Sequence, residues 1–174
     1  INIPDTVTSN GTTYSVTTIA DSAFRSNSLT SVTIPDNVTA IGNQAFAFNN
    51  LASVTIGSSV TTIATQAFAY NDSLNSLTIP DSVTTIEDRA FYNTSLTSVT
   101  IPDSVTIIGE QAFGGNDSLT SVTFLGNFGT FNLNMFTNNP NLTTITYDPR
   151  KTDWPQTFTP AGSGSVAAIS GAFE

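Results

Sequence analysis

SLTSVTIPDNVTAIGNQAF, residues 28–46, decides the fold, because near copies of it follow in the same chain. The copies are LASVTIGSSVTTIATQAF at 51–68, SLNSLTIPDSVTTIEDRAF at 73–91 and SLTSVTIPDSVTIIGEQAF at 95–113. The leucines that open successive copies are 22 or 23 residues apart, at Leu29, Leu51, Leu74, Leu96, Leu119 and Leu142. A period of this length indicates a solenoid, in which each repeat is one turn of a coil.

Each copy contains two apolar patterns. The pattern L-x-x-V-x-I, seen at Val32 and Ile34, alternates and is rich in β-branched residues, so it predicts a short strand with Val and Ile buried. Pro35-Asp36 then ends the strand and turns the chain. The three-residue spacing of Val38 and Ile41 favours an extended arc or a tight helical turn along the opposite wall. Asn-rich ends such as Asn49-Asn50 reverse the chain, because Asn and Asp tolerate the left-handed region.

No single copy can bury its own Leu, Val, Ile and Phe. Stacked copies align equivalent side chains into continuous ladders, with neighbouring strands about 4.8 Å apart. We therefore expect stability to depend on contacts between neighbouring repeats.

The motif L-x-x-V-x-I-P-D-x-V-x-x-I-x-x-x-A-F, over residues 1 to about 147, resembles the BspA-like, or Treponema pallidum-type, leucine-rich-repeat family. The resemblance implies a right-handed repeat solenoid, with short parallel β-strands on one face and irregular, short helical or extended segments on the other. The general consensus places Asn at the ninth position of each copy, which suggests a weaker polar ladder here. That position holds Asn37, Ser59, Ser82, Ser104 and Asn127.

The chain divides into an N-terminal partial repeat at 1–24, leucine-rich repeats at 25–147, and a C-terminal closure with a linker at 148–174. Asn10-Gly11 is a strong turn signal, so we expect residues 6–16 to form a β-hairpin that caps the first repeat. In the degenerate later repeat, Phe128, Phe131, Met135 and Phe136 are expected to replace Val, Ile, Ala and Phe. Trp154 is expected to close the coil, and the Gly/Ser-rich residues 161–174 read as a linker.

Composition limits the class of partner. The chain has 174 residues and a net charge of −9, with only four basic residues, so nucleic acid is an improbable partner. No apolar run approaches the roughly 18 residues of a membrane span, so we expect no membrane insertion. With 30 Thr, 20 Ser and 17 Asn, hydroxyls and amides must cover most of the surface. The chain begins at Ile1 rather than Met, so we expect it to be part of a larger multidomain protein.

The chain has no Cys and no His, which removes thiolate chemistry, His–metal sites and Ser-His-Asp catalysis. Asp81 and Asp103 on adjacent repeats could resemble a glycosidase pair, but an Asp after Pro is usually a turn residue. The same column, extended by Asp5 and Asp36, could bind Ca²⁺, although Ser58 interrupts it. We predict no enzyme activity, no catalytic residues, no metal site and no cofactor.

Two surfaces are candidates for binding. Strand alternation turns the residues that flank the buried Val outward, which predicts two hydroxyl columns. The columns are Ser31/Thr33, Ser53/Thr55, Ser76/Thr78, Ser98/Thr100, Ser121/Thr123 and Thr144/Thr146. Thr is also simply a favourable exposed strand residue, so duplication alone could explain them. At the loop edge, Phe48, Tyr70 and Tyr92 suggest an aromatic strip suited to protein or sugar contact, with coverage of the core as the alternative.

The family resemblance implies surface or secreted modules that mediate adhesion. The leading hypothesis is an extracellular or cell-surface module that binds a protein or glycan, on another cell or in the matrix, through the strand face. One alternative is a structural spacer within a larger surface protein. A second is an ice-binding surface made of the Thr and Ser columns.

Overall fold

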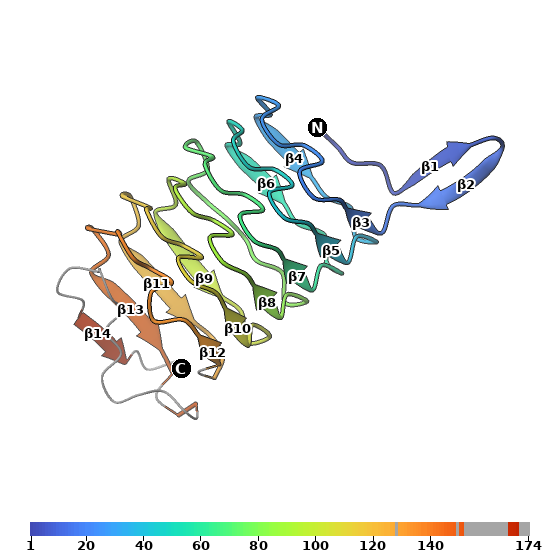
Figure 1. Ribbon diagram of the computed structural model, residues 1–174. Coiled ribbons are helices and arrows are strands. Elements are labelled where there is room, and N and C mark those ends of the chain that lie inside the picture. Colours follow the sequence, from blue (N-terminus) through green and yellow to red (C-terminus); the bar gives the residue numbers. More distant parts are fainter. Residues whose placement is uncertain (128, 149, 152–166, 171–174) are drawn as a thin grey trace.

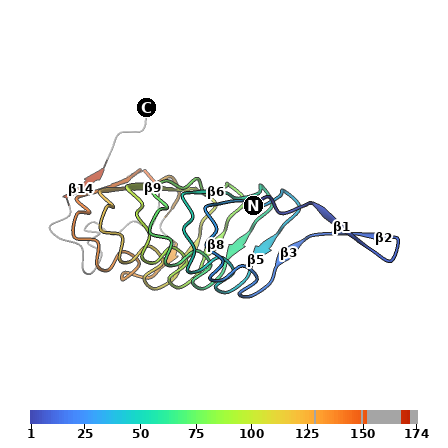
Figure 2. The same ribbon diagram turned by 90° about the horizontal axis from the view of Figure 1, so that it is seen from above.

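The protein is a coil of stacked repeats with strands on two opposite faces (Figures 1 and 2). The structure is a computed structural model that describes residues 1–127, 129–148, 150, 151 and the backbone of 167–170. We call residues 1–28 rung 1, and the segments that open at Leu29, Leu51, Leu74, Leu96 and Leu119 rungs 2 to 6. This described part contains no helix, and hence none long and apolar enough to cross a membrane. The extended alternative for the second wall is therefore confirmed.

The strand face carries the L-x-x-V-x-I segments. Its strands are β4 (Ser31–Thr33), β6 (Ser53–Thr55), β9 (Ser98–Ile101), β11 (Ser121–Phe124), β13 (Thr144–Tyr147) and β14 (Ala167–Ser170). They pair in parallel as two separate sheets, β4-β6 and β9-β11-β13-β14. The equivalent segment of rung 4, residues 74–80, forms no strand. The strand face is therefore interrupted at rung 4.

The back face carries the V-x-x-I segments as one continuous sheet. Its strands are β3 (Thr18–Ile19), β5 (Ala40–Ile41), β7 (Thr62–Ile63), β8 (Thr85–Ile86), β10 (Ile107–Ile108) and β12 (Thr130–Phe131). Each strand pairs in parallel with the equivalent residues of the next rung, as Ile41 does with Ile63. In every strand the second residue is buried. In rungs 2 to 5 the spacing of Val and Ile thus places two apolar side chains against the core, because Val38, Val60, Val83 and Val105 are buried as well.

A stack of phenylalanines fills the third edge of the core. The rings of successive rungs lie 5.2 to 5.7 Å apart between centroids and are close to parallel. The stack consists of Phe24, Phe46, Phe68, Phe91, Phe113 and Phe136. All of them except Phe24 are completely buried. A Phe that recurs every 22 or 23 residues therefore produces one aromatic ladder.

A ladder of buried asparagines lies beside these rings, at Asn49, Asn71, Asn116 and Asn139. In Asn71, Nδ2 donates to the carbonyls of Phe46 (3.0 Å) and Phe68 (2.9 Å). Its Oδ1 accepts from the backbone N–H of Leu51 (3.1 Å). This buried polar ladder follows Ala-Phe, while at the ninth position Asn37 and Ser82 also bond the preceding rung by donating to the carbonyls of Asp5 and Val60.

The predicted role of these asparagines was wrong, because none of the four has a positive φ. The left-handed residue is the one before each of them: Phe48, Tyr70, Gly115 and Asn138, with Asn93 before Thr94 in rung 4. The asparagines are needed for their side-chain hydrogen bonds, not for their tolerance of the left-handed region.

The predicted hairpin forms, but it does not cap the coil. β1 (Thr6–Ser9) and β2 (Thr12–Ser15) pair antiparallel across a turn in which Asn10 and Gly11 both have positive φ, as a type I′ turn requires. All eight strand residues are exposed, and the hairpin projects away from the coil (Figures 1 and 2). Instead, residues 1–3 pair beside β4, where Ile3 donates to the Thr33 carbonyl (3.0 Å).

The C-terminal end confirms the predicted core residues but contradicts the predicted linker. Phe131, Met135 and Phe136 are buried, which confirms their role as core substitutes. Phe128 and Trp154 lie outside the described residues. The linker prediction was wrong for Ala167–Ser170, because these residues form β14 on the edge of β13. The boundaries at residues 24 and 147 stay predictions.

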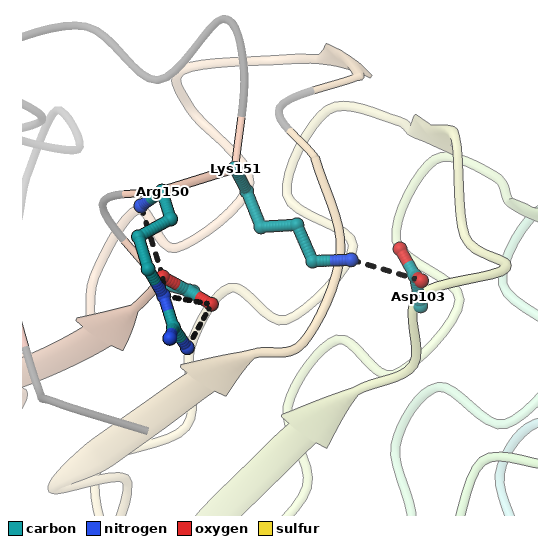
Figure 3. A network of polar contacts seen from close by, with 4 residues as sticks. Asp103, Arg150 and Lys151 are labelled. Carbon is teal, nitrogen blue, oxygen red and sulfur yellow. Dashed lines mark hydrogen bonds and ion pairs between the residues drawn. The ribbon is translucent and has the colours of Figure 1, made fainter. Parts of the chain in front are cut away.

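Two ion pairs follow β13 (Figure 3). Lys151 Nζ lies 3.1 Å from an Asp103 carboxylate oxygen, which joins the end of β13 to the turn of rung 5. Arg150 binds both carboxylate oxygens of Asp148 at 2.9 to 3.2 Å. The side-chain hydrogen bonds from Arg150, followed by its backbone N–H, lower the pKa of Asp148.

Candidate binding faces

Parallel pairing aligns the predicted hydroxyl columns of the strand face. Ser31 and Thr33 lie opposite Ser53 and Thr55 in the first sheet, and all four are exposed. In the second sheet, Ser98 and Thr100 are exposed. Their aligned partners in β11 and β13 are half-buried: Ser121, Thr123, Thr144 and Thr146. The structure thus brings ten of the twelve residues into two aligned groups.

Ser76 and Thr78 belong to neither group. Both are exposed, but they lie on the rung 4 segment that forms no strand. β6 pairs only with β4, and β9 pairs only with β11. Although residues 76–79 are fully described, no backbone hydrogen bond joins them to either neighbour. Each hydroxyl column is therefore divided at rung 4.

Gly57 is one local difference in the sequence next to the division. It replaces the Pro that follows the strand in rungs 2, 4 and 5, and a Cβ at residue 57 would lie only 2.2 Å from the carbonyl oxygen of Pro35. The next residue, Ser58, donates its backbone N–H to Asp36 Oδ1 (2.8 Å). The turn of rung 3 therefore packs closely on the turn of rung 2.

Leu77 is a second local difference. Other rungs place β-branched residues at this strand position: Val32, Val54, Val99, Val122 and Ile145. A β-branched side chain suits the pleated surface of a strand better than the longer, γ-branched Leu does. Leu77 and its neighbour Val54 are only half-buried, unlike Val32, Val99 and Val122. The apolar contact between rungs 3 and 4 is correspondingly incomplete.

Two hollows flank the interrupted segment. The first, of about 380 Å³, separates rungs 3 and 4, and its lining includes Val54, Thr55, Ile56, Ser58, Thr78 and Pro80. The second, of about 280 Å³, separates rungs 4 and 5, and its lining includes Leu77, Thr78, Ile79, Thr100, Pro102 and Leu125. Asp36 lines the first and Asp81 the second. Sequence reasoning missed both hollows, although Gly57 in place of Pro was a visible signal.

The aspartates considered for catalysis or calcium binding have different surroundings. Asp36 Oδ1 accepts from Ser58, and this backbone hydrogen bond, together with one from the Ser58 side chain, lowers the Asp36 pKa. Asp103 pairs with Lys151, whereas Asp81 lines the second hollow. Among the residues with a defined placement, no three acidic side chains form a group suited to a metal ion.

The aromatic strip is a stack of rings. Phe48 and Tyr70 lie 4.4 Å apart between centroids at an interplanar angle of 11°, and Tyr92 meets Tyr70 edge-on at 5.6 Å. Arg25, from the rung on the other side, lies 4.9 Å from the Phe48 centroid. Both faces of Phe48 are therefore covered. The rings thus pack on one another along the turn edge, where Phe48 stays 42% exposed and Tyr70 and Tyr92 are half-buried.

Comparisons with known proteins agree with this architecture. A family model described as BspA type leucine-rich repeat region matches six copies, at residues 1–117 and 41–158. No curated protein matches the chain.

Several solved structures are similar. A leucine-rich repeat protein from Bacteroides ovatus is 31% identical, with a TM-score of 0.72 over 84% of this chain and 39% of its own length. The Treponema pallidum leucine-rich repeat protein is 26% identical, with a TM-score of 0.71 over 84% of this chain and 72% of its own. The pneumococcal vaccine antigen PcpA, at 17% identity and a TM-score of 0.51 over 91% of this chain and 60% of its own, shows the fold alone.

The repeat motif, the two-faced coil and the family match agree over most of the chain. The chain spans 39% of the length of the Bacteroides ovatus protein, so the comparison concerns the repeat region of that protein. This chain belongs to the BspA-type leucine-rich-repeat family.

Proposed function

We propose that the chain is an extracellular, cell-surface adhesion module that binds a protein or a glycan through its strand face. The observation that carries the proposal is the set of exposed hydroxyls, aligned from strand to strand on one face. Repeat solenoids typically bind partners through such extended surfaces. The proposed role is binding, without catalysis or a cofactor.

The chemistry of the face supports a polar interface. Ser and Thr side chains are short, so a partner can approach the backbone closely and little side-chain entropy is lost on binding. Each hydroxyl both donates and accepts a hydrogen bond, and neighbouring rungs repeat it about every 4.8 Å. A protein surface or a glycan on another cell or in the matrix offers matching groups.

A triple substitution tests the strand face. Replacing Thr55, Thr78 and Thr100 with Lys puts long charged side chains on three successive rungs, all at exposed positions. We expect adhesion of the parent cells, and binding of the purified chain to protein and glycan arrays, to fall at least tenfold. The matched control places Lys at Thr39, Thr61 and Thr84, which are exposed beside the back face.

The same experiment separates adhesion from the spacer alternative. Unchanged adhesion by the strand-face variant, with the thermal midpoint retained, overturns the proposal and favours a spacer. Ice binding would require a continuous, regular Thr array, whereas the columns here are divided at rung 4 and half-buried in β11 and β13. Ice-crystal shaping by the purified chain would favour that second alternative.

A further inference from the structure

The two hollows beside Thr78 combine an apolar wall with one carboxylate each. Val54, Ile56 and Pro80 contribute apolar surface to the first, where Asp36 lies. Leu77, Ile79 and Pro102 do the same for the second, where Asp81 lies. Lysine and arginine match such a site, because an aliphatic stem carries a cationic head at its end.

The carboxylates in the hollows are not neutralised by the chain's own cations. Of the four basic residues, Lys151 pairs with Asp103, and Arg150 pairs with Asp148. Arg25 and Arg89 pack against the aromatic rings of Phe48 and Tyr92. None of the four lines either hollow. With a net charge of −9, the chain attracts a basic partner.

The interruption of the backbone ladder on the strand face adds hydrogen-bond acceptors to this site. The backbone carbonyls of residues 76–79, which lie between the hollows, have no backbone partner among the described residues. Ammonium and guanidinium heads carry three and five N–H donors, so one head can bind a carboxylate and a carbonyl together. The hydroxyls of a neutral sugar could donate hydrogen bonds to the carboxylates but would leave their charge uncompensated, and an anionic glycan would be repelled by them.

We propose that the hollows on either side of Thr78 bind two basic side chains from an extended segment of a partner protein. The inference rests on the proposed function, because it names the partner class and the place on the strand face. In an extended segment, residues i and i+2 point the same way and lie about 7 Å apart. Neighbouring rungs repeat about every 4.8 Å, so two long, flexible basic side chains that leave the segment about 7 Å apart can reach hollows that are one rung apart.

The test uses the full chain and a fluorescein-labelled octapeptide of alternating Arg and Thr, followed by anisotropy. A peptide with norleucine in place of Arg keeps most of the aliphatic stem and removes the charge. Asp36→Asn with Asp81→Asn removes both carboxylate charges, yet the amide oxygen introduced at position 36 can still accept from Ser58. The matched control is Asp72→Asn with Asp117→Asn, which removes the same charge from two exposed residues elsewhere.

We expect the wild-type chain and the control pair to bind the Arg peptide within about twofold of each other. Asp36→Asn with Asp81→Asn should weaken binding at least tenfold, and the norleucine peptide should not bind. In methyl NMR spectra, the peptide should shift Val54, Leu77 and Ile79 but leave Ile145 unmoved. Equal weakening by both Asp pairs, shifts outside the hollows, or no peptide binding would overturn the inference.

The two proposals fail in different ways. If the Thr55, Thr78 and Thr100 variant loses adhesion while Asp36→Asn with Asp81→Asn adheres normally, the strand face stands and the basic-segment site falls. If the Asp pair loses peptide binding while the Thr variant still adheres, the hollows stand and the adhesive strand face falls. Retained binding of a glycan by the Asp pair would identify a glycan as the ligand and overturn the basic-segment site.

Discussion

The Phe–Asn edge of the coil and its strand face come from the same repeats but differ in continuity. Along the edge, the phenylalanine rings stack from Phe24 to Phe136 without a gap. On the strand face, the backbone ladder stops on both sides of residues 76–79. Where the backbone ladder of the strand face is missing, rungs 3 to 5 are still joined by the phenylalanine stack, by backbone hydrogen bonds along that edge and by the continuous back sheet.

Rung 4 departs from the repeat at this edge too, just as Leu77 departs from it on the strand face. Rung 4 has Thr94 where the neighbouring rungs have Asn, yet Thr94 donates its backbone N–H (3.0 Å) and its hydroxyl to Asn116 Oδ1. A second kind of bond therefore replaces the lost one. At Leu77 the packing of Val54 is incomplete, and within the described part of the chain no side-chain hydrogen bond replaces the missing backbone bonds of residues 76–79.

Truncating the phenylalanine stack should have the largest effect. Phe68 is completely buried between Phe46 and Phe91. We expect Phe68→Ala to lower the free energy of unfolding by about 3–5 kcal/mol, because a cavity opens in the middle of the ladder. Urea unfolding measures the loss. The control is Phe48→Ala, at a 42% exposed side chain, and an equal loss in both variants would contradict the comparison.

Breaking the asparagine ladder should have the second-largest effect on stability. Asn71→Ala removes the side-chain partners of the Leu51 N–H and of the Phe68 carbonyl inside the coil, whereas the Phe46 carbonyl keeps its bond from Asn49. An unsatisfied buried group costs about 1–3 kcal/mol, so we expect a loss of about 2–3 kcal/mol in urea unfolding. Asn50→Ala, at an exposed neighbour of the ladder, should change stability by less than about 0.5 kcal/mol.

Restoring a side chain at residue 57 tests the origin of the first hollow. The new Cβ of Gly57→Ala would meet the Pro35 carbonyl oxygen at 2.2 Å, so rung 3 must move toward rung 4. We expect a loss of about 1–3 kcal/mol from this crowding. A crystal structure should show a smaller hollow. Ser59→Ala is the control at an exposed neighbour, and an unmoved rung 3 in the Gly57 variant would refute the explanation.

The smallest effect is expected from repairing the strand face. Leu77→Val restores the β-branched residue of the other rungs, and we expect slower amide hydrogen exchange at residues 76–79. Stability should change by less than about 1 kcal/mol, since the position is half-buried. The amide of Ile145, in the paired strand β13, is the internal reference. Unchanged exchange at 76–79 would show that Leu77 does not cause the interruption.

The sequence alone determined the repeat, the two walls of the coil and the identity of its core residues. The reason is that a 22- or 23-residue period forces equivalent side chains into register, so one copy such as 95–113 predicts them all. The outward direction of the Ser and Thr columns follows from strand alternation in the same way.

Only the tertiary structure decided how far these regularities extend. The asparagines of the turns became a buried ladder because their amides bridge two rungs, a contact that no single repeat contains. The Asn10-Gly11 hairpin projects from the coil because hairpin pairing is local, and nothing in a turn signal directs it onto rung 1. The interruption at rung 4 lies beside a close approach of Gly57 to Pro35, a packing distance between residues 22 positions apart that no single repeat specifies.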